Sequence, residues 1–315
     1  MRRYLPQVRL PGWDQEALPK KSALIIGVGG LGTPAALYLA AMGIGKLFLV
    51  DPDTIAEENL HRQPLYLPTQ IGRLKVEALS AYLKAFRPDM VIETYPVWVD
   101  APFLQTVGPQ ADIWIDGTDN LQSRLLIDAQ ASAIGKPWVY GAIFQWEGQA
   151  ALWQGLRYKD FFGEAEGGPS CSEAGVLGGL PGIIGSLQAT LAAQYLSDPT
   201  SAPVNRLFTI DLRRGETHTF LLAPSTSLPL EIALAQAYTL PQPLWIDLRE
   251  EPKKPLPFPH QRWRWYQWDT WELPSQPIVF VCETGQRSRQ VAFLLRKKTG
   301  RTNLYSLRGG TQALL

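Results

Sequence analysis

Two turns in the sequence contain residue types that can hold an anion, and both lie between an apolar run and a helical pattern. The first is Gly27–Gly32, with the letters GVGGLG. A turn of this kind directs backbone N–H groups and a helix N-terminus at a phosphate. Asp51 ends the next apolar run, where a carboxylate can accept a hydrogen bond from a ribose hydroxyl. The glycines therefore predict a nucleotide site, although an NAD-dependent dehydrogenase has the same letters.

The second turn surrounds a cysteine. Cys282 ends the run PIVFVC and is followed by the loop ETGQRS and a helical pattern. This order directs N–H groups and a helix N-terminus at the sulfur, and Arg287 adds positive charge. These conditions stabilise a thiolate or persulfide anion, whereas the neighbouring Glu283 opposes ionisation. The sequence therefore predicts a reactive cysteine at this turn.

The elements that position these turns alternate between strands and helices. Expected strands cover 22–27, 46–51, 112–116 and 137–142, and expected helices cover 33–43, 73–86 and 123–135. The helix over 73–86 is expected to bury one stripe, formed by Val76, Leu79, Leu83 and Phe86. Alternation of this kind predicts an α/β fold with a Rossmann-like doubly wound, mostly parallel sheet. The runs 205–212 and 215–222 predict an antiparallel extension of it.

A proline- and serine-rich stretch over 223–229 interrupts this pattern. We expect a domain over 1–224 and a second, small α/β domain over 225–315. The second should contain a helix over 231–238 and strands over 243–248 and 277–282. Its tryptophans at 263, 265, 268 and 271 are expected to pack in the core.

Composition excludes several classes of protein. With 30 Lys+Arg against 29 Asp+Glu, no basic surplus exists to bind nucleic acid. Two cysteines exclude a disulfide framework and a four-cysteine zinc site, and they favour a reducing compartment. The uncharged stretch 174–197 is interrupted by glycines, a proline and glutamines, which predicts a core helix over 185–196 rather than a membrane span. With no signal-peptide pattern at the N-terminus, we expect a cytoplasmic protein.

Further motifs follow the glycine turn in a fixed order. They are Asp51-Pro52-Asp53, Asn59-Leu60-His61-Arg62-Gln63, Gly72-Arg73-Leu74-Lys75-Val76, and Gly117-Thr118-Asp119-Asn120 with Arg124. Through these motifs, residues 3–222 resemble the ThiF/MoeB/HesA family, the bacterial relatives of ubiquitin-activating enzymes. Members adenylate the C-terminal glycine of a ubiquitin-like sulfur-carrier protein with ATP and magnesium. The resemblance therefore implies ATP rather than NAD.

The resemblance also implies roles for individual residues. It places Arg62 and Lys75 at the phosphates, Asn59 and Gln63 beside them, Asp51 at the ribose and Asp119 at magnesium, with Gly29, Gly30, Gly32, Asp53 and Asn120 completing the nucleotide site. A C-terminal carboxylate has a pKa of about 3.5, so it is already ionised at neutral pH and attacks without a general base. The reaction needs cations around the triphosphate and alignment of the reactants.

The sequence departs from the family at two places. The family's N-terminal motif has a second arginine that reaches the ATP of the partner subunit, and here Pro6 replaces it. Arg9 is a candidate substitute, two positions along the segment, and relatives lead us to expect a homodimer. Many relatives also have two Cys-x-x-Cys pairs. Because residues 158–162 (YKDFF) stand in their place, we expect no structural zinc.

Residues 225–315 resemble a rhodanese-like domain. The resemblance includes the motifs Ile246-Asp247-Leu248-Arg249-Glu250 and Leu304-Tyr305-Ser306-Leu307-Arg308-Gly309-Gly310. Related phosphatases have one more residue between cysteine and arginine, so the shorter spacing from Cys282 to Arg287 favours sulfur over phosphate. Several ThiF-type relatives also have a loop cysteine that bonds the carrier, and Cys171 is the candidate here. A buried, unreactive cysteine remains the alternative for it.

Together these features predict a fused sulfur-transfer enzyme. Its partners would be a carrier ending in Gly-Gly and a persulfide donor such as a cysteine desulfurase, in molybdopterin, thiamin or related thiocarboxylate synthesis. Three alternatives stay open: a non-catalytic family member, a peptide-modifying family member and an NAD-binding oxidoreductase.

Overall fold

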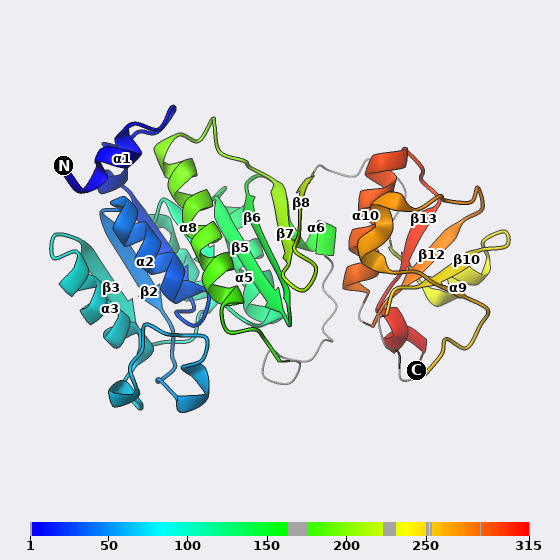
Figure 1. Cartoon of the computed structure of the whole chain (residues 1–315), viewed down its shortest axis with the longest axis horizontal. Helices are drawn as coiled ribbons and strands as arrows, with labels where there is room; N and C mark the ends of the chain where they lie inside the picture. Colours follow the sequence, from blue (N-terminus) through cyan, green and yellow to red (C-terminus); the bar gives the residue numbers. More distant parts are fainter. Residues whose placement is uncertain are drawn as a thin grey trace. The chain divides into compact units, whose positions relative to one another are not determined.

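The computed structural model describes residues 2–162, 175–222, 231–249, 252, 254–283 and 285–314. The described residues divide into two compact units, each with its own sheet (Figure 1). The first unit comprises residues 2–157 and those from 175 to 222, and the second comprises 158–162 and those from 231 onward. The candidate Cys171 lies outside the described residues, as do Glu250 and Thr284.

The first unit has an eight-stranded sheet with the order β3-β2-β1-β4-β5-β6-β7-β8. Its strands are β1 (Ser22–Ile26), β2 (Lys46–Val50), β3 (Val91–Tyr95), β4 (Ile113–Asp116), β5 (Trp138–Phe144), β6 (Glu147–Trp153), β7 (Arg206–Asp211) and β8 (Glu216–Leu221). The strands from β3 to β5 are parallel, and β6, β7 and β8 are antiparallel. The predicted doubly wound sheet and its antiparallel extension are therefore confirmed.

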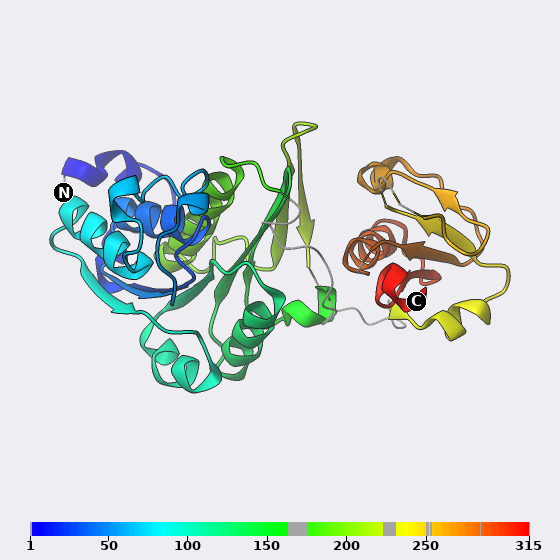
Figure 2. The same ribbon diagram turned by 90° about the horizontal axis from the view of Figure 1, so that it is seen from below.

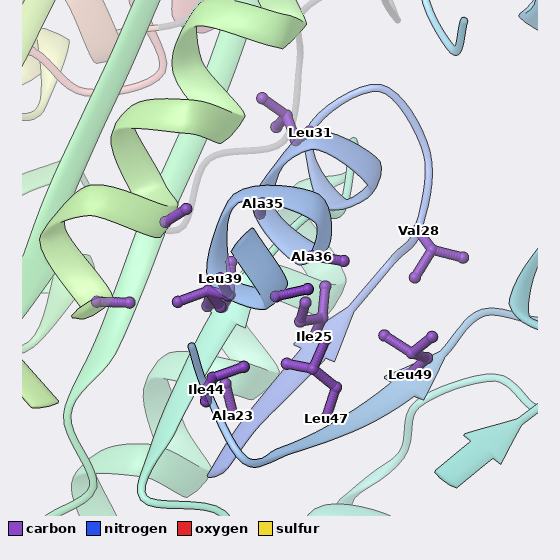
Figure 3. Close-up of a cluster of buried hydrophobic side chains, with 14 of the residues drawn as sticks. Ala23, Ile25, Val28, Leu31, Ala35, Ala36, Leu39, Ile44, Leu47 and Leu49 are labelled. Atoms are coloured by element: carbon purple, nitrogen blue, oxygen red, sulfur yellow. The ribbon is translucent and has the colours of Figure 1, made fainter. Parts of the chain in front are cut away.

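Helices cover both faces of this sheet. They are α1 (Leu5–Val8), α2 (Gly32–Met42), α3 (Lys75–Phe86), α4 (Ala101–Thr106), α5 (Leu121–Ala133) and α8 (Leu180–Ser197). Side chains of α2, α3 and α8 share one buried core with β1 and β2. Figure 3 shows Ala35, Ala36 and Leu39 of α2 in one cluster with Ile25 and Leu47. Figure 2 shows α4 and α5 on the opposite face, and the strands β1, β2 and β4 are buried almost throughout.

Two helices differ from their sequence predictions. In α3, Val76, Leu79 and Leu83 are buried as expected, but Phe86 is 37% exposed. That prediction was wrong because α3 ends at Phe86, where its side chain packs against Arg3 rather than the sheet. The helix α8 begins at Leu180, several residues earlier than expected. No helix in the described part of the chain is long and apolar enough to cross a membrane.

The second unit has a five-stranded, parallel sheet with the order β11-β10-β12-β13-β9. Its elements are β9 (Glu231–Ile232), α9 (Leu234–Tyr238), β10 (Leu244–Asp247), β11 (Gln261–Arg262), η6 (Trp265–Thr270), β12 (Ile278–Val281), α10 (Gln286–Thr299), β13 (Leu304–Leu307) and η7 (Gly310–Leu314). The helix expected over 231–238 was wrong at its start, because Glu231 and Ile232 pair with β13. All four predicted tryptophans pack against the core, as expected.

The second unit also contains a short helix from the middle of the chain. Helix α6 (Tyr158–Phe162) follows β6 in the sequence and packs on α10. Phe161 meets Phe293 edge to face, with ring centroids 5.3 Å apart. The guanidinium of Arg289 donates to the Asp160 carbonyl and to Glu231 at 2.8 Å. Helix α6 is therefore held on α10, which comes much later in the sequence, and the same guanidinium joins α10 to β9.

Candidate functional site

The glycine turn lies where the order of the first sheet reverses. β1 pairs with both β2 and β4, so the crevice outside its carboxyl end is the usual ligand position in such sheets. A Cβ on Gly27, which has a φ of +86°, would lie 2.7 Å from the carbonyl oxygen of Gly117. A Cβ on Gly32 would lie 1.9 Å from the carbonyl oxygen of Gly27. These glycines let the two strand ends and α2 approach closely enough to form the crevice.

Asp51 is hydrogen-bonded to the backbone of this turn. Its carboxylate accepts hydrogen bonds from the N–H groups of Val28 at 2.8 Å and Asp53 at 2.9 Å. Burial raises the pKa of Asp51, and the nearby Lys75 opposes that shift. Two acceptor oxygens on a buried carboxylate leave lone pairs for a ribose hydroxyl.

The predicted nucleotide residues surround one cavity of about 550 Å³. Its lining includes Gly29, Gly30, Asp51, Asp53, Asn59, Arg62, Gln63, Lys75, Asp119 and Asn120. Gly32 is buried behind the turn as the first residue of α2. Residues from five separated segments of the sequence therefore meet in one place, and their individual roles stay predictions.

The cations of the cavity differ in their surroundings. The Lys75 ammonium is 2.8 Å from Asp53, and its side chain is only 6% exposed. Arg62 is half-buried and donates to the Glu58 carbonyl at 3.1 Å. Gln63, which also lines the cavity, is 3% exposed, and its Oε1 has no hydrogen-bond partner. A buried amide oxygen in this state is costly unless a ligand or water supplies a donor.

Another part of the cavity lining comes from the turn after β4 and the start of α5. Asn120 caps α5 by accepting from the Ser123 N–H at 2.8 Å, and the neighbouring Asp119 is exposed. Arg124 donates to the fully buried Asp116 at 2.8 Å and to the Gly141 carbonyl at 3.0 Å. Arg124 therefore ties α5 to the strand ends.

Two features of this site were missed at the sequence level. Val97, Trp98 and Val99 also line the cavity, and the Trp98 side chain is 73% exposed. An exposed tryptophan just after a strand end was the available signal. The phenol of Tyr66 donates to the Val28 carbonyl at 2.7 Å, and burial raises its pKa, so it remains a donor. No motif points to Tyr66, because its partners are backbone atoms.

The cysteine turn in the second unit has the predicted geometry. The sulfur of Cys282 accepts from the N–H groups of Gly285 at 3.2 Å and Ser288 at 3.3 Å. Ser288 lies in the first turn of α10, and its hydroxyl is 3.3 Å from the sulfur. Cys282 itself is 3% exposed. The expected N–H groups at this sulfur are therefore confirmed.

Two arginines and a second glycine complete this loop. The Arg287 guanidinium lies over the Trp265 ring, 4.8 Å from its centroid. Arg249 is paired with Asp247 at 2.8 Å, and this hydrogen bond raises the pKa of Arg249. A Cβ on Gly310 would lie 2.2 Å from the Cys282 carbonyl oxygen and 2.6 Å from the Gly285 nitrogen. The loop is therefore packed directly against the chain after β13.

Metal ligands are sparse in both sites. Across the ranges that the structure describes, no three His, Cys, Asp or Glu side chains gather as a metal site would require. Helix α6 occupies the segment 158–162, at which the expectation of no structural zinc was made. Mg²⁺ takes most of its ligands from phosphates and water, so a nucleotide-bound ion needs no such group.

Comparison with known families assigns both units. Residues 2–230 match the ThiF family, which is well over half of the chain. The chain belongs to the ThiF family. Residues 236–315 match the rhodanese-like domain. The predicted combination of these two domains is therefore confirmed.

Several curated proteins resemble this ThiF-family chain. A probable molybdopterin-synthase adenylyltransferase of Porphyra purpurea is 43% identical over 199 residues, which are 61% of this chain and 52% of that protein. The sulfur carrier protein adenylyltransferase of Thermus thermophilus is 37% identical over 203 residues, 61% of this chain and 74% of that protein. The probable adenylyltransferase/sulfurtransferase MoeZ of Mycobacterium tuberculosis is 32% identical over 235 residues, which are 71% of this chain and 59% of that protein. The chain thus spans about half the length of the Porphyra relative.

Among solved structures, Escherichia coli MccB with ATP superposes on this chain with a TM-score of 0.59. The two are 20% identical over 67% of each chain. This likeness supports the fold of the first unit.

Proposed function

We propose that this ThiF-family chain adenylates the C-terminal Gly-Gly of a ubiquitin-like sulfur-carrier protein and then transfers sulfur to it. The relatives from Thermus and Mycobacterium bear names that describe these two activities. The observation that supports the first step is the common cavity of Arg62, Lys75 and Asp119 beside the glycine turn. Three separated motifs supply opposite charges there, as a triphosphate and its metal ion require.

In the first step, the carrier's terminal carboxylate attacks the α-phosphorus of ATP and pyrophosphate leaves. The carboxylate is ionised at neutral pH, so this chain need not remove a proton. Lys75 and Arg62 would offset the charge of the phosphates, and Asp51 would accept from a ribose hydroxyl. Because Lys75 is paired with Asp53, binding of a phosphate would replace or share that carboxylate partner.

Mg²⁺ bound with ATP would neutralise part of the phosphate charge. Asp119, an exposed carboxylate in the cavity wall, is the residue that would hold it. The unpartnered Oε1 of Gln63 would receive a donor from ordered water around the phosphates. The residues present therefore fit a magnesium nucleotide.

The adenine base would lie against Trp98. Asp51 follows β2, and its own N–H donates to the carbonyl of Tyr95 at the end of β3. A ribose bound at Asp51 therefore places its base next to residues 97–99, which follow β3. The exposed indole of Trp98 offers a flat apolar surface for stacking.

In the second step, the terminal sulfur of a Cys282 persulfide attacks the acyl carbonyl and AMP leaves. The product is an acyl disulfide between the carrier and Cys282. A second thiol, for which Cys171 is the candidate, attacks the Cys282 sulfur, releases the thiocarboxylate and forms a disulfide with Cys282. A dithiol reductant then restores both thiols, and a persulfide donor such as a cysteine desulfurase reloads Cys282. Free thiols of this kind suit the cytoplasm.

We also propose that the active form is a homodimer. The N-terminal segment packs at the far end of α2 from the glycine turn, where Gln7 donates to the Met42 carbonyl at 3.2 Å. Arg9 is exposed on this segment and is absent from the lining of its own cavity. If Arg9 replaces the arginine missing at position 6, it must therefore act on the site of a second copy.

The first test is ATP–pyrophosphate exchange with purified ubiquitin-like carriers that end in Gly-Gly. Exchange that depends on such a carrier supports adenylation. Carrier binding without exchange with any of them would leave a non-catalytic protein, and exchange with short peptides alone would indicate a peptide-modifying enzyme. A calorimetric response to NAD but not to ATP would indicate an oxidoreductase.

The second test separates the two steps. Cys282→Ala should leave exchange unchanged and abolish thiocarboxylate, as measured by the mass of the carrier. Loss of both activities in a folded variant would contradict this division between the two units. Cys171→Ser should slow product release if Cys171 cleaves the acyl disulfide, whereas an unchanged rate would assign that step to an external thiol.

A further inference from the structure

A buried pair of hydroxyls lies behind the Cys282 sulfur. Ser288 and Ser306 are both fully buried, and their oxygens are 2.8 Å apart. The Ser288 hydroxyl is 3.3 Å from the sulfur and 3.1 Å from the Gly285 carbonyl oxygen. The Ser306 hydroxyl is 3.3 Å from the same carbonyl oxygen. Both hydroxyls therefore share one carbonyl acceptor, and only Ser288 reaches the sulfur.

The position of Ser306 is fixed by the sheet. It lies in β13, opposite Phe280 of β12 and Glu231 of β9, so a strand on each side holds its backbone. Ser288, in contrast, lies in the first turn of α10. A serine on a central strand of a buried parallel sheet replaces the apolar side chain usual there. Its buried hydroxyl therefore needs a hydrogen-bond partner.

Each hydroxyl has one proton, so each can donate only one hydrogen bond at a time. When Cys282 is a thiol, its S–H can donate to Ser288, and Ser288 can donate to the Gly285 carbonyl. When the sulfur is an anion, Ser288 must turn its proton toward the sulfur, and the Gly285 carbonyl keeps the N–H of Arg289 as its donor at 3.0 Å. Ser306 can then donate to the Gly285 carbonyl or to the Ser288 oxygen. Without Ser306, the buried Ser288 oxygen would have no hydroxyl donor while its own proton is directed at the sulfur.

We propose that Ser306 is a positioning residue for the reactive sulfur, acting through Ser288. Its hydroxyl donates to the Ser288 oxygen while Ser288 donates to the sulfur anion, and it thereby raises the reactivity of Cys282 toward sulfur donors. This role rests on the proposed function only in taking Cys282 as the reacting group.

The test is the rate at which iodoacetamide alkylates Cys282 in the full chain at neutral pH, followed by peptide mass mapping, which separates Cys282 from Cys171. We expect Ser288→Ala to react about tenfold more slowly and Ser306→Ala about fivefold more slowly. Thr299→Ala removes a hydroxyl from the far end of α10, which donates to the Leu295 carbonyl, and should leave the rate unchanged. Equal slowing in Thr299→Ala would overturn the proposal.

A double-variant comparison distinguishes positioning from packing. Because Ser306 acts through Ser288, adding Ser306→Ala to Ser288→Ala should cause no further slowing. Independent, multiplied effects would overturn the proposal. The pair Ser306→Thr and Ser306→Val has nearly the same shape and differs in the hydroxyl. Ser306→Thr should react about fivefold faster than Ser306→Val, and equal rates would also overturn it, even if Ser306→Ala does not fold.

Alkylation requires no carrier, nucleotide or persulfide donor, so these results are independent of the proposed function. A chain that shows the Ser306 effect but forms no thiocarboxylate would refute the proposed function and leave the positioning role intact. The reverse outcome would refute the positioning role alone.

Discussion

The turn after β1 and the turn after β12 use the same backbone design for different anions. Each follows a parallel strand, contains a glycine in the left-handed region (Gly27 at +86° and Gly285 at +88°) and leads into a helix. Each is also packed against a second glycine from a neighbouring strand end, Gly117 or Gly310. The close approach of two glycines is therefore the shared requirement of the two sites.

The two turns differ in what neutralises the anion. The first opens on a cavity of about 550 Å³, where Lys75 and Arg62 supply positive charge. The second closes on a buried sulfur, and its nearest donors are neutral N–H and hydroxyl groups. A large, soluble anion needs space and cations, whereas an anion bonded to the chain is held by fixed dipoles.

The largest expected effect is on the cations of the first turn. Lys75→Ala should lower ATP–pyrophosphate exchange by about 100-fold or more, because fixed charge around the phosphates is lost. Alkylation of Cys282 should not change. Lys84→Ala, on the exposed face of the same helix, is the matched control and should retain exchange. A loss of less than tenfold for Lys75→Ala would mean that the first turn does not depend on this charge.

The second prediction concerns the close approach at the cysteine turn. Gly310→Ala places a Cβ against the Cys282 carbonyl and the Gly285 nitrogen, so sulfur transfer should fall about tenfold or more, and the melting temperature should drop by several degrees. Gly300→Ala has a similar φ of +71° with no atom within 4 Å of the added Cβ. It should lose only the roughly 1–2 kcal/mol of an unfavourable backbone conformation. Equal losses in calorimetry would show that crowding at Gly310 is unimportant.

The third prediction tests whether the open cavity binds a base. Trp98→Ala should raise the KM for ATP about fivefold or more and leave kcat nearly unchanged, because stacking is lost equally in the bound substrate and the transition state. Trp146→Ala, which removes an indole 44% exposed outside the cavity lining, serves as the control. An unchanged KM in Trp98→Ala would place the base elsewhere.

The smallest expected effect is a pH dependence of the free energy of unfolding. It arises at the first turn, where Asp51 titrates. Burial raises the pKa of Asp51 above the ordinary 3.8, so the folded chain takes up this proton before the unfolded chain does. As pH rises from 3.8 through the raised pKa, the contribution of Asp51 to the free energy of unfolding decreases. Urea unfolding should therefore show the parent gaining stability relative to Asp51→Asn as pH falls through this interval.

Asp89 gives a control of opposite sign. Its hydrogen bond to Arg87 lowers its pKa to about 2 from 3.8, so its contribution is present above 3.8 and lost as pH falls toward 2. The parent should lose stability relative to Asp89→Asn over that interval. The same sign for both variants would contradict the burial of the Asp51 charge.

Much of the fold could be predicted because its signals are local. Apolar runs mark β1, β2, β4 and β12, and the glycine turns and acidic strand ends lie directly beside them in the sequence. The start of β9 could not be predicted, because Glu231 and Ile232 become a strand only by pairing with β13. The burial of Phe86 was mispredicted for a related reason, because helical periodicity does not show where a helix extends beyond the strands that it packs against.

The candidate sites show the same limit at the level of single residues. The common cavity of Arg62, Lys75 and Asp119 was expected from the resemblance of their motifs to the ThiF/MoeB/HesA family, and the structure brings them together. The pairing of Lys75 with Asp53 and the contact of Ser306 with Ser288 join positions that have no shared pattern in the sequence. Such contacts depend on which strand ends become neighbours, so they follow from topology.

Helix α6 has a consequence for how this protein can be divided. A gene cut anywhere between the two sheets would separate α6 from α10, leaving the Phe293 ring without Phe161 and the Arg289 guanidinium without the Asp160 carbonyl. The rhodanese-like half is thus completed by a stretch encoded inside its fusion partner. Because α6 belongs to the second unit but is encoded within the first, the two units cannot be separated at a single point in the gene. This arrangement makes the fusion difficult to reverse in evolution.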